Sequence, residues 1–387
     1  MPHAFAIASI FFLTLAAGYF FIIIKYIRGW ESLAEWYLPT RYIPKIKVSV
    51  IIPARNEEGK IIACLNSILK NNYPENLFEI IVVDDHSTDG TFLLVDNFAK
   101  KHTSVKVLKL AKILNGQIIN SFKKVAIETG IKNAAGELII TTDADCIVPE
   151  NWLLLITSFC EINNLEFVAG PVNFHNEKSF FEKFQSLDFI GMMGVTGAGI
   201  FSGWMNMCNG ANLAYTKKIF KEINGFKGIK HLASGDDILL MQKVAAHCPG
   251  KVGFLKNKKT TVLTSPKPTI KSFIGQRLRW ATKSASYVEW KITFVLAVVF
   301  IFCAVILFSF FMFFIDGIKW VVLFSVLFLI KSTADYFFLK KMTDYFDRND
   351  LMKTYLGSQV LHVLYIVVIG CLSNVKKEYK WKGRKVR

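Results

Sequence analysis

Long apolar runs constrain the fold of this chain more than any other feature of its sequence. Residues 3–24 and 292–315 contain no Asp, Glu, Lys or Arg, and each run is long enough for a helix that crosses the hydrocarbon core of a bilayer. Residues 320–330 continue weakly toward Leu339 as a third run, and residues 355–373 form a fourth candidate. The stretch between the first two runs has ordinary globular composition and suits one domain of moderate size or two small ones.

The flanks of the first run, the charge and the cysteines indicate where the chain lies. No basic segment precedes the run and no small-x-small cleavage site follows it, so we expect a membrane anchor over residues 1–28 rather than a cleaved signal peptide. The formal charge of +17 suits nucleic acid or anionic lipid; the apolar runs favour lipid, and no nucleic-acid-binding motif is evident. The seven cysteines show no metal-ligand spacing, which indicates reduced thiols in the cytosol.

The stretch between the membrane runs alternates short buried strands with amphipathic helices. VSVII, FEIIVVDD, VKVLKL and ELIITT are typical of strands, and residues 57–72, 89–102 and 121–137 are typical of helices. This alternation predicts an α/β domain with a mainly parallel sheet. In such sheets ligands bind at the carboxyl ends of the strands.

Two pairs of acidic residues fall at the carboxyl ends of expected strands. Asp84 and Asp85 follow one strand, and Asp143 and Asp145 flank a single alanine in TTDADC. Two carboxylates held close together raise each other's pKa unless a cation lies beside them. A turn or a helix N-cap would explain one aspartate, whereas Mg²⁺ or Mn²⁺, bound to carboxylates and substrate phosphates, would explain the pair. We therefore expect a metal–diphosphate site here.

Five motifs follow one another in this sequence: VSVIIPARNEE, EIIVVDDHSTDGT, ELIITTDADC, SGDDILL and GQRLRW. Each is weak alone, but the ordered set, over roughly residues 47–285, resembles the inverting family-2 glycosyltransferases, which have the GT-A fold. The flanking apolar runs resemble the integral-membrane branch of that family, which includes ceramide glucosyltransferases and polysaccharide synthases. The implied fold is α/β: a Rossmann-like GT-A domain with a mainly parallel sheet, placed in the cytosol and flanked by transmembrane helices.

The resemblance implies a nucleotide site at the ends of the first two strands. Arg55 and Glu57 are the polar members of its first nucleotide-contacting loop. Either Asp84 or Asp85 would accept a hydrogen bond from the uracil or ribose of a UDP-sugar, and the resemblance does not say which.

The resemblance also implies how the diphosphate is held. Asp143 and Asp145 would hold Mg²⁺ or Mn²⁺ on it, with Asp145 the direct ligand. Lys123 or Lys124 matches a lysine that lies near the nucleotide, and we assign this role to Lys124. The alternative for this lysine is a solvated helix face.

SGDDILL stands where the family has an acid–Asp pair at the start of a helix. Asp237 would be the general base, which takes the proton of the acceptor hydroxyl as its oxygen attacks the anomeric carbon. Asp236 is its catalytic companion, although Gly235-Asp236 replaces the commoner Thr-Glu. Helix N-capping is the alternative for both acids, and the two roles can coexist.

GQRLRW matches the family's Gln-x-x-Arg-Trp motif through Gln276, Arg279 and Trp280. Arg279 would clamp the diphosphate, since a guanidinium forks onto phosphate oxygens. Trp280 would form part of the acceptor floor by stacking on sugar or lipid. The alternative is a basic interfacial helix with its tryptophan at the headgroup level. Arg277 has no assigned role.

Two further segments bear on the acceptor. MCNGANLAY resembles the acceptor-side strand of the family, in which Asn209, Gly210 and Asn212 would line the sugar site; a β-turn is the alternative. Residues 189–207 are rich in glycine and methionine and too broken to predict a span. They lie either at the bilayer surface beside the site or in plain core.

The basic tail sets a condition on the membrane topology. Basic flanks stay in the cytosol, but three crossings after a cytosolic domain would put the tail outside. Either one C-terminal run does not span, or the domain has an extra re-entrant partner. The expected parts are a transmembrane anchor (1–28), a GT-A domain (45–268), an interfacial helix with the Gln-x-x-Arg-Trp motif (269–290), C-terminal transmembrane helices (291–375) and a basic tail (376–387).

We therefore expect an integral protein of the cell inner membrane that transfers a hexosyl or N-acetylhexosaminyl group from a nucleotide-sugar to a lipid or lipid-linked acceptor. The resemblance implies UDP as the nucleotide. Nucleic acid is not an expected partner. A processive polysaccharide synthase is the second hypothesis, because four membrane helices are few for a polymer channel. A non-catalytic membrane scaffold is the third. A transporter fits least, since the sequence shows no evident charge pair within the membrane runs.

Overall fold

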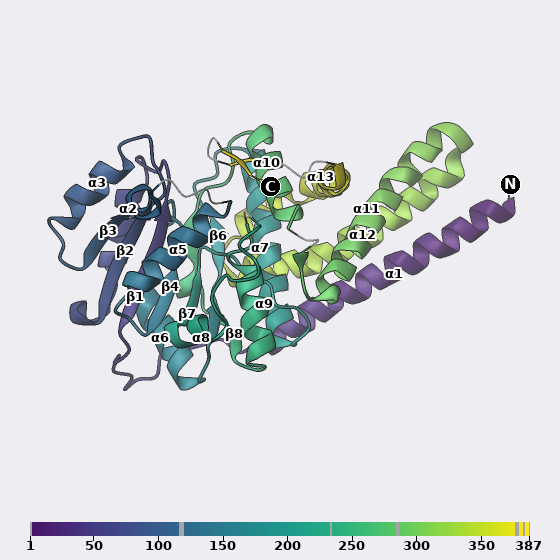
Figure 1. Cartoon of the computed structure of the whole chain (residues 1–387). Coiled ribbons are helices and arrows are strands. Elements are labelled where there is room, and N and C mark those ends of the chain that lie inside the picture. Colours follow the sequence, from purple (N-terminus) through teal and green to yellow (C-terminus); the bar gives the residue numbers. More distant parts are fainter. Residues whose placement is uncertain are drawn as a thin grey trace. The chain divides into compact units, whose positions relative to one another are not determined.

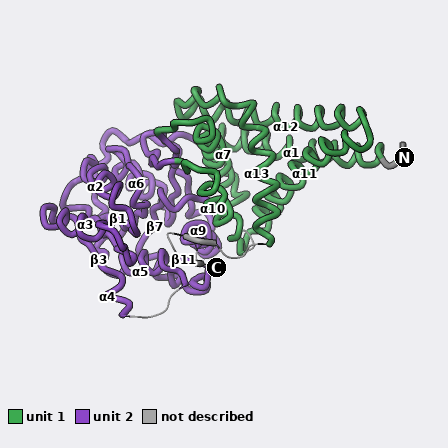
Figure 2. Tube along the Cα trace, turned by 90° about the horizontal axis from the view of Figure 1, so that it is seen from above, with its two compact units in different colours: residues 1–33, 176–205, 266–377 green, residues 34–175, 206–265, 378–387 purple. Residues whose placement is uncertain are grey.

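The computed structural model describes residues 2–115, 120–232, 234–283, 286–375, 379–381 and 384–386. The chain divides into two compact units, coloured separately in Figure 2. Unit 1 consists of residues 1–33, 176–205 and 266–377, and unit 2 of residues 34–175, 206–265 and 378–387. Residues 176–205, which lie inside the expected 45–268 domain, thus group with the helical unit.

Unit 2 is built on a seven-stranded sheet within the described residues (Figure 1). In sheet order its strands are β3 (Val105–Lys109), β2 (Phe78–Asp84), β1 (Val48–Ala54), β4 (Leu138–Thr141), β7 (Leu213–Thr216), β5 (Phe167–Ala169) and β8 (Val252–Phe254). Of these, β7 runs antiparallel to both of its neighbours, and the other pairings are parallel. The predicted α/β fold with a mainly parallel sheet is confirmed.

The strands at the centre of the sheet are buried on both faces, which explains their continuous apolar sequences. Glu79 is the polar exception in β2. Its carboxylate accepts hydrogen bonds from Ser49 Oγ at 2.7 Å and from the Ala135 N–H at 2.6 Å, and it pairs with Lys106 at 2.7 Å. These three partners offset the cost of burying the charge.

Helices pack against the sheet at positions where small residues allow close approach. On α5 (Phe122–Asn133), a Cβ added at Gly130 would lie 2.5 Å from Ile51 Cγ2 of β1, so only glycine lets the helix lie this close to the sheet. The other helices and the small second sheet of this unit are α2 (Ile61–Leu69), α3 (Thr91–Ala99), α4 (Leu110–Leu114), α6 (Trp152–Ile162), α8 (Lys217–Glu222), α9 (Ile238–His247), and the pair β6 (Val172–Phe174) and β9 (Val262–Thr264).

Unit 1 is helical. Four helices in the described part of the chain are long and apolar enough to cross a membrane: Phe5–Ser32, Trp290–Asp316, Ile318–Tyr345 and Asn349–Val375. The helices of this unit are α1 (Pro2–Ser32), α7 (Phe180–Phe201), α10 (Ile270–Ala281), α11 (Trp290–Asp316), α12 (Ile318–Tyr345) and α13 (Tyr355–Val375). The expected membrane helices are thus present as elements.

The part of the glycine-rich segment 189–207 up to Phe201 lies in one continuous helix, α7, and residues 202–207 follow its end. α7 begins with a capping box of Ser179 and Glu182, and most of its length is buried within unit 1. Its small residues serve packing: a Cβ at Gly194 would collide with Met342 of α12, and a Cβ at Gly29 of α1 would lie 3.1 Å from Ala198. Small residues of this kind let membrane helices approach each other closely.

Unit 1 also contains a buried charge pair, so the expectation that the membrane runs hold none is wrong. On α12, Lys331 Nζ lies 2.7 Å from Asp335 Oδ2 and also donates to Gln359 Oε1 of α13 at 2.8 Å. Tyr19 of α1 donates to Asp335 Oδ1 at 2.5 Å. The pair is one helical turn apart, and its groups bond three helices together without leaving either charge unpaired.

A hairpin near the end of the chain fixes the parity of the membrane crossings. The strands β10 (Tyr379–Trp381) and β11 (Arg384–Val386) belong to unit 2, and Arg384 Nη1 lies 2.8 Å from Asp85 Oδ2. Two groups in contact lie on the same side of a membrane. The three helices α11, α12 and α13 separate them along the chain, so they cannot all cross completely. Figure 1 shows α13 nearly end-on while α11 and α12 run along the page, so α13 is oriented differently from the other two helices.

This parity predicts the labelling of single cysteines by a membrane-impermeant maleimide in sealed vesicles. In a variant without reactive native cysteines, Lys101→Cys on the surface of unit 2 and Val375→Cys at the end of α13 should both be labelled when the side of the membrane that carries unit 2 faces the reagent. Asp316→Cys, at the end of α11, should be labelled only when the opposite side of the membrane faces the reagent. Labelling of Val375→Cys together with Asp316→Cys, and not together with Lys101→Cys, would contradict this prediction.

Candidate active site

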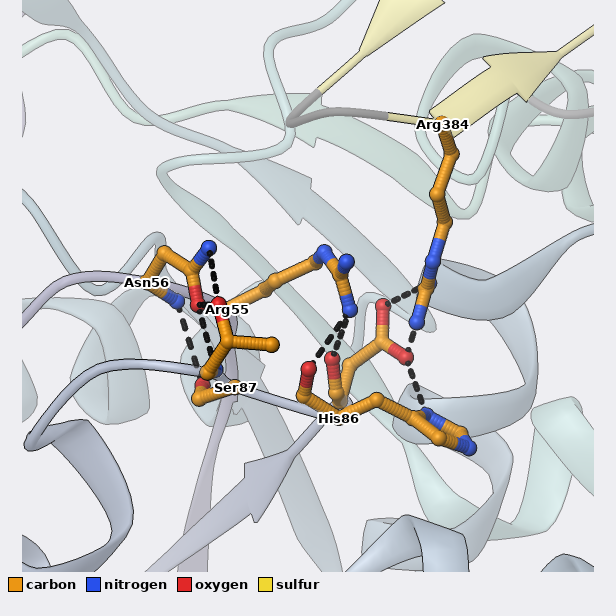
Figure 3. Close-up of polar contacts among 7 residues, drawn as sticks. Arg55, Asn56, His86, Ser87 and Arg384 are labelled. Atoms are coloured by element: carbon orange, nitrogen blue, oxygen red, sulfur yellow. Dashed lines mark hydrogen bonds and ion pairs between the residues drawn. The ribbon is translucent and has the colours of Figure 1, made fainter.

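Two loops at the carboxyl ends of β1 and β2 are locked together. β1 and β2 pair in register, and the loop after each strand contains a residue with left-handed backbone, Asn56 (φ 51°) and His86 (φ 55°). The Asn56 N–H donates to Ser87 Oγ at 3.1 Å, and Asn56 Oδ1 accepts the Thr88 N–H at 2.9 Å (Figure 3). Asparagine and histidine tolerate this conformation better than most residues, so the two loops form one rigid edge.

Arg55 supports this edge from within. Its Nη1 donates to the main-chain carbonyls of Asp85 at 2.9 Å and of His86 at 2.7 Å (Figure 3). Burial, together with the nearby Arg384 guanidinium, lowers the pKa of Arg55 from its usual value. Glu57 follows in the same loop, and its N–H donates to Thr91 Oγ1 at 2.8 Å.

The two aspartates at the end of β2 differ in their surroundings. The carboxylate of Asp84 is buried, and neither of its oxygens has a hydrogen-bond partner within the described residues. The carboxylate of Asp85 is also buried but accepts from Arg384 Nη1 at 3.0 and 2.8 Å and from His86 Nδ1 at 2.9 Å. Asp85 is therefore the acid of this pair whose acceptor capacity is already in use.

A second cluster forms around Lys123 at the start of α5. Its ammonium lies 2.8 Å from Asp143 Oδ1 and 3.0 Å from Asp236 Oδ2. A Cβ added at Gly210 would lie 3.3 Å from Lys123 Nζ, so glycine leaves room for the cluster. Burial alone would lower the pKa of Lys123, but the carboxylates of Asp143 and Asp236 outweigh it and raise the pKa. The lysine thus stays charged and screens the acids from each other.

Asp143 and Asp145 retain accessible oxygens. Their side chains are 38% and 24% exposed, and Lys60 Nζ lies 3.7 Å from Asp145 Oδ2. Within the described ranges, no group of three or more His, Cys, Asp or Glu side chains is arranged to hold a metal ion. The donor set fits a hard cation such as Mg²⁺ or Mn²⁺, which commonly takes one or two carboxylates and completes its shell with phosphate and water oxygens.

The cysteines beside these acids are not suited to bind metal. Burial raises the pKa of Cys64 and of Cys146, and the carboxylates of Asp143 and Asp145 raise both further. Both thiols are therefore protonated at neutral pH, and a protonated thiol is a poor metal ligand.

The SGDDILL segment places its two acids in different roles. Gly235 has a φ of +83°, which favours glycine, and the turn it makes leads into α9. Asp237 is the N-cap of α9 and accepts the Ile238 N–H at 2.8 Å, so the N-capping alternative holds for this residue. Asp236 instead points to Lys123. Both carboxylates therefore lie at the edge of the acidic cluster.

Consecutive lysines on α5 point to different places. Lys124, assigned to the nucleotide from the sequence, is fully buried and donates to the carbonyls of Ile229, Leu232 and Ser234 at 2.7 Å each. Its neighbour Lys123 lies among the acids. Successive helical residues are rotated by about 100°, so only one of the two can face the cluster, and no local sequence signal says which.

Asn212, expected at the sugar site, is buried, and its side-chain amide is hydrogen-bonded within the core. It accepts from Trp152 Nε1 at 2.9 Å and donates to the carbonyls of Pro171 and Thr260 at 2.8 and 2.9 Å. The side-chain oxygen of Asn209 accepts the Ala211 N–H at 2.9 Å. This contact is typical of a turn, which is the alternative to a role in the sugar site.

The Gln-x-x-Arg-Trp motif lies on α10 of unit 1, which begins with a capping box at Thr269. Arg277 is 4% exposed, lies 2.6 Å from Asp188 of α7, and stacks over the Trp280 ring at 4.5 Å. Trp280 also stacks on Phe189 with ring centres 6.1 Å apart. Arg277, which had no assigned role, thus fixes the helix that carries the motif. Gln276 and Arg279 lie on the same helix.

Comparison with known proteins adds the family. The model of "Glycosyl transferase family group 2" matches residues 138–366, more than half of the chain, and that of "Glycosyl transferase family 2" matches residues 49–224. The chain is a family 2 glycosyltransferase. The resemblance in the ordered motifs is therefore confirmed, as is the expectation that this chain is an enzyme.

Relatives of this glycosyltransferase are distant. It is 28% identical to glycosyltransferase AglE of Haloferax volcanii over 49% of this chain and 59% of that one. It is 26% identical to a poly-beta-1,6-N-acetyl-D-glucosamine synthase of Staphylococcus epidermidis over 46% of this chain and 41% of the other. The match thus spans less than two thirds of these relatives.

A solved structure supports the GT-A fold. The mannosyltransferase PcManGT from Pyrobaculum calidifontis, in complex with GDP-Man and Mn²⁺, superposes with a TM-score of 0.60 at 17% identity. The superposition covers 92% of this chain and 99% of that one. The GT-A fold with candidate membrane helices is confirmed.

The cluster around Lys123 predicts the effect of removing its charge. Lys123→Met leaves two carboxylates without their cation, which should cost about 2 kcal/mol of unfolding free energy, less than a fully buried pair because Asp143 is partly exposed. The matched control, Lys100→Met, breaks an exposed pair with Asp96 and should change it by at most about 0.5 kcal/mol. The check is thermal unfolding of the purified variants; equal midpoints for both would contradict a screening role.

Proposed function

We propose that this glycosyltransferase transfers a sugar from a nucleotide-sugar, with UDP as the expected nucleotide, to a lipid or lipid-linked acceptor with inversion. The observation that carries the proposal is the cluster of Asp143, Asp236 and Lys123, with Asp237 beside it, at the carboxyl ends of the strands. Relatives and structural neighbours named for sugar transfer support it, including one solved with GDP-Man and Mn²⁺.

On the donor side, Asp143 and Asp145 would hold Mg²⁺ or Mn²⁺. When bound, this ion would neutralise the charge that develops on the leaving diphosphate. Lys123 is the fixed cation of the same site and would attract the diphosphate in place of one of its present carboxylate partners. Geometry thus favours Lys123 over Lys124 as the lysine near the nucleotide, because the ammonium of Lys124 is used by three carbonyls.

On the acceptor side, Asp237 would act as the general base. Its carboxylate accepts the Ile238 N–H at the start of α9, which holds the side chain in place. A single displacement needs one such base, which takes the proton of the attacking hydroxyl. Asp236, bound to Lys123, would keep the ammonium in place between donor and base.

The membrane unit supports a lipid acceptor. Four candidate membrane-spanning helices accompany the catalytic unit. We place unit 2 on the cytosolic side, since Lys25 and Arg28 follow the apolar part of α1. Arg279 as a diphosphate clamp, Gln276 beside it and Trp280 as an acceptor floor remain proposals on α10. The poly-N-acetylglucosamine synthase relative keeps a processive synthase as the second candidate.

The test of the proposal is a donor screen on the purified, detergent-solubilised chain. Nucleotide release would be followed from UDP- and GDP-sugars, with Mg²⁺ or Mn²⁺, with and without a lipid extract. Release that requires one donor, a metal ion and lipid is the expected result. Sustained release without lipid, with a growing insoluble product, would favour the synthase. No release from any donor would favour a non-catalytic scaffold.

The base assignment predicts the behaviour of Asp237→Asn. The amide still caps α9 but cannot take a proton, so donor binding should be unchanged while transfer falls by about 10²–10⁴-fold. Donor affinity and initial transfer rate, measured on the same preparation, separate these effects. An exposed carboxylate far from the site, changed as Asp96→Asn, is the control. Turnover of Asp237→Asn near the wild-type rate would show that another group is the base.

A further inference from the structure

The β10–β11 hairpin brings an arginine onto the proposed nucleotide site from the other end of the chain. Arg384 Nη1 donates to both carboxylate oxygens of Asp85, at 3.0 and 2.8 Å (Figure 3). The Asp85 side chain is 3% exposed and that of Arg384 is 16% exposed. The pair is thus shielded from water, and charge-assisted hydrogen bonds in such a place are among the stronger ones.

The same guanidinium lies over an aromatic ring. The Arg384 guanidinium carbon lies 3.6 Å from the centre of the Phe122 ring, which is stacking distance. Phe122 in turn meets the His86 ring edge-on at 5.8 Å. Arg384 therefore presents a planar π-system to an aromatic face while its N–H groups point at a carboxylate.

A nucleobase could make the same two interactions, stacking on the Phe122 ring and donating a hydrogen bond to the Asp85 carboxylate. It is planar, it stacks on aromatic side chains, and uracil and guanine each carry a ring N–H that a carboxylate accepts. His86 Nδ1 already occupies Asp85 Oδ1, which leaves Oδ2 as the freer acceptor for one ring N–H. Phe122 is followed directly by Lys123 of the diphosphate cluster. Both residues lie in the first turn of α5, so the aromatic ring and the diphosphate cluster are at the same end of that helix.

We propose that Arg384 of the hairpin lies in the place of the nucleobase, between Asp85 and Phe122, in the nucleotide-free protein. This inference rests on the proposed function and adds to it the specific base-contacting residues and their competitor. Arg384 of the hairpin then competes with the nucleotide-sugar for this site and must leave when the nucleotide-sugar binds. It also decides between the two candidate acids, because Asp85 rather than Asp84 faces the platform.

The electrostatics of the site allow this occupant to leave. Arg55 lies near Arg384, and its pKa is lowered first by burial and next by that second guanidinium. Arg55 Nη1 binds the main-chain carbonyl of Asp85 at 2.9 Å, and the repulsion between the two guanidinium groups weakens the hold of Arg384 on the Asp85 carboxylate. A neutral base on Phe122 would relieve this repulsion while Asp85 keeps a donor.

The test measures UDP and GDP affinity by titration calorimetry on the full-length chain in detergent, with Mn²⁺ present. Arg384→Ala removes the competitor and should tighten UDP binding about tenfold, the equivalent of one charge-assisted hydrogen bond. Lys385→Ala removes the same charge from the next position of β11 and should leave the affinity unchanged. Equal thermal midpoints would show that both variants are folded.

Substitution of Phe122 provides a second, independent test of the proposal. Phe122→Ala should weaken UDP binding about tenfold or more, since base–aromatic stacking is lost, and Phe122→Tyr should keep it. The double variant Phe122→Ala with Arg384→Ala should bind more weakly than Arg384→Ala alone. Unchanged UDP affinity in Phe122→Ala would show that the base does not stack on Phe122.

The possible outcomes distinguish a failure of the inference about Arg384 from a failure of the proposed function. If Arg384→Ala binds UDP as the wild type does, the hairpin is only a structural clasp and the inference fails. If it binds more weakly, Arg384 is a nucleotide ligand rather than a competitor, and the inference also fails. If neither the wild type nor Arg384→Ala binds UDP or GDP, the proposed function itself fails.

Discussion

The ammonium of Lys123 is the interaction on which the site depends. It joins the end of β4, through Asp143, to the start of α9, through Asp236, while its own helix α5 is packed on β1 by Gly130. Without a cation, acids brought together by strand ends and a helix start would repel one another. One lysine therefore lets the fold hold a concentration of negative charge that a metal–diphosphate complex can use.

Much of this arrangement follows from the sequence because it is local or periodic. Buried strands have continuous apolar runs, and the carboxyl ends of parallel strands meet at one edge, so Asp84, Asp85, Asp143 and Asp145 were predicted there. The acid at 237 was expected at a helix start because SGDDILL resembles the family's acid–Asp segment. These signals depend on neighbours within a few residues.

The remainder depends on contacts between distant segments, which a single sequence does not reveal. Lys123 and Lys124 are equivalent in the sequence, and only the rotation of α5 against the sheet distinguishes them. Arg384 meets Asp85 across 299 residues, and Arg277 meets Asp188 across 89. Lys331 interrupts an apolar run, but its burial became evident only with Asp335, Tyr19 and Gln359 around it. The glycines of α7 suggested a broken segment because their packing partners lie on other helices.

The central claim is that Asp143 and Asp145 bind a divalent cation together with the nucleotide diphosphate. The most direct test is electron paramagnetic resonance of Mn²⁺ with the purified chain, with and without UDP. Two carboxylates form an incomplete ligand set, so the account predicts weak Mn²⁺ binding alone, strong binding with UDP, and loss of the UDP-dependent binding in Asp145→Asn. Equal Mn²⁺ binding by the wild type and Asp145→Asn in the presence of UDP would contradict it.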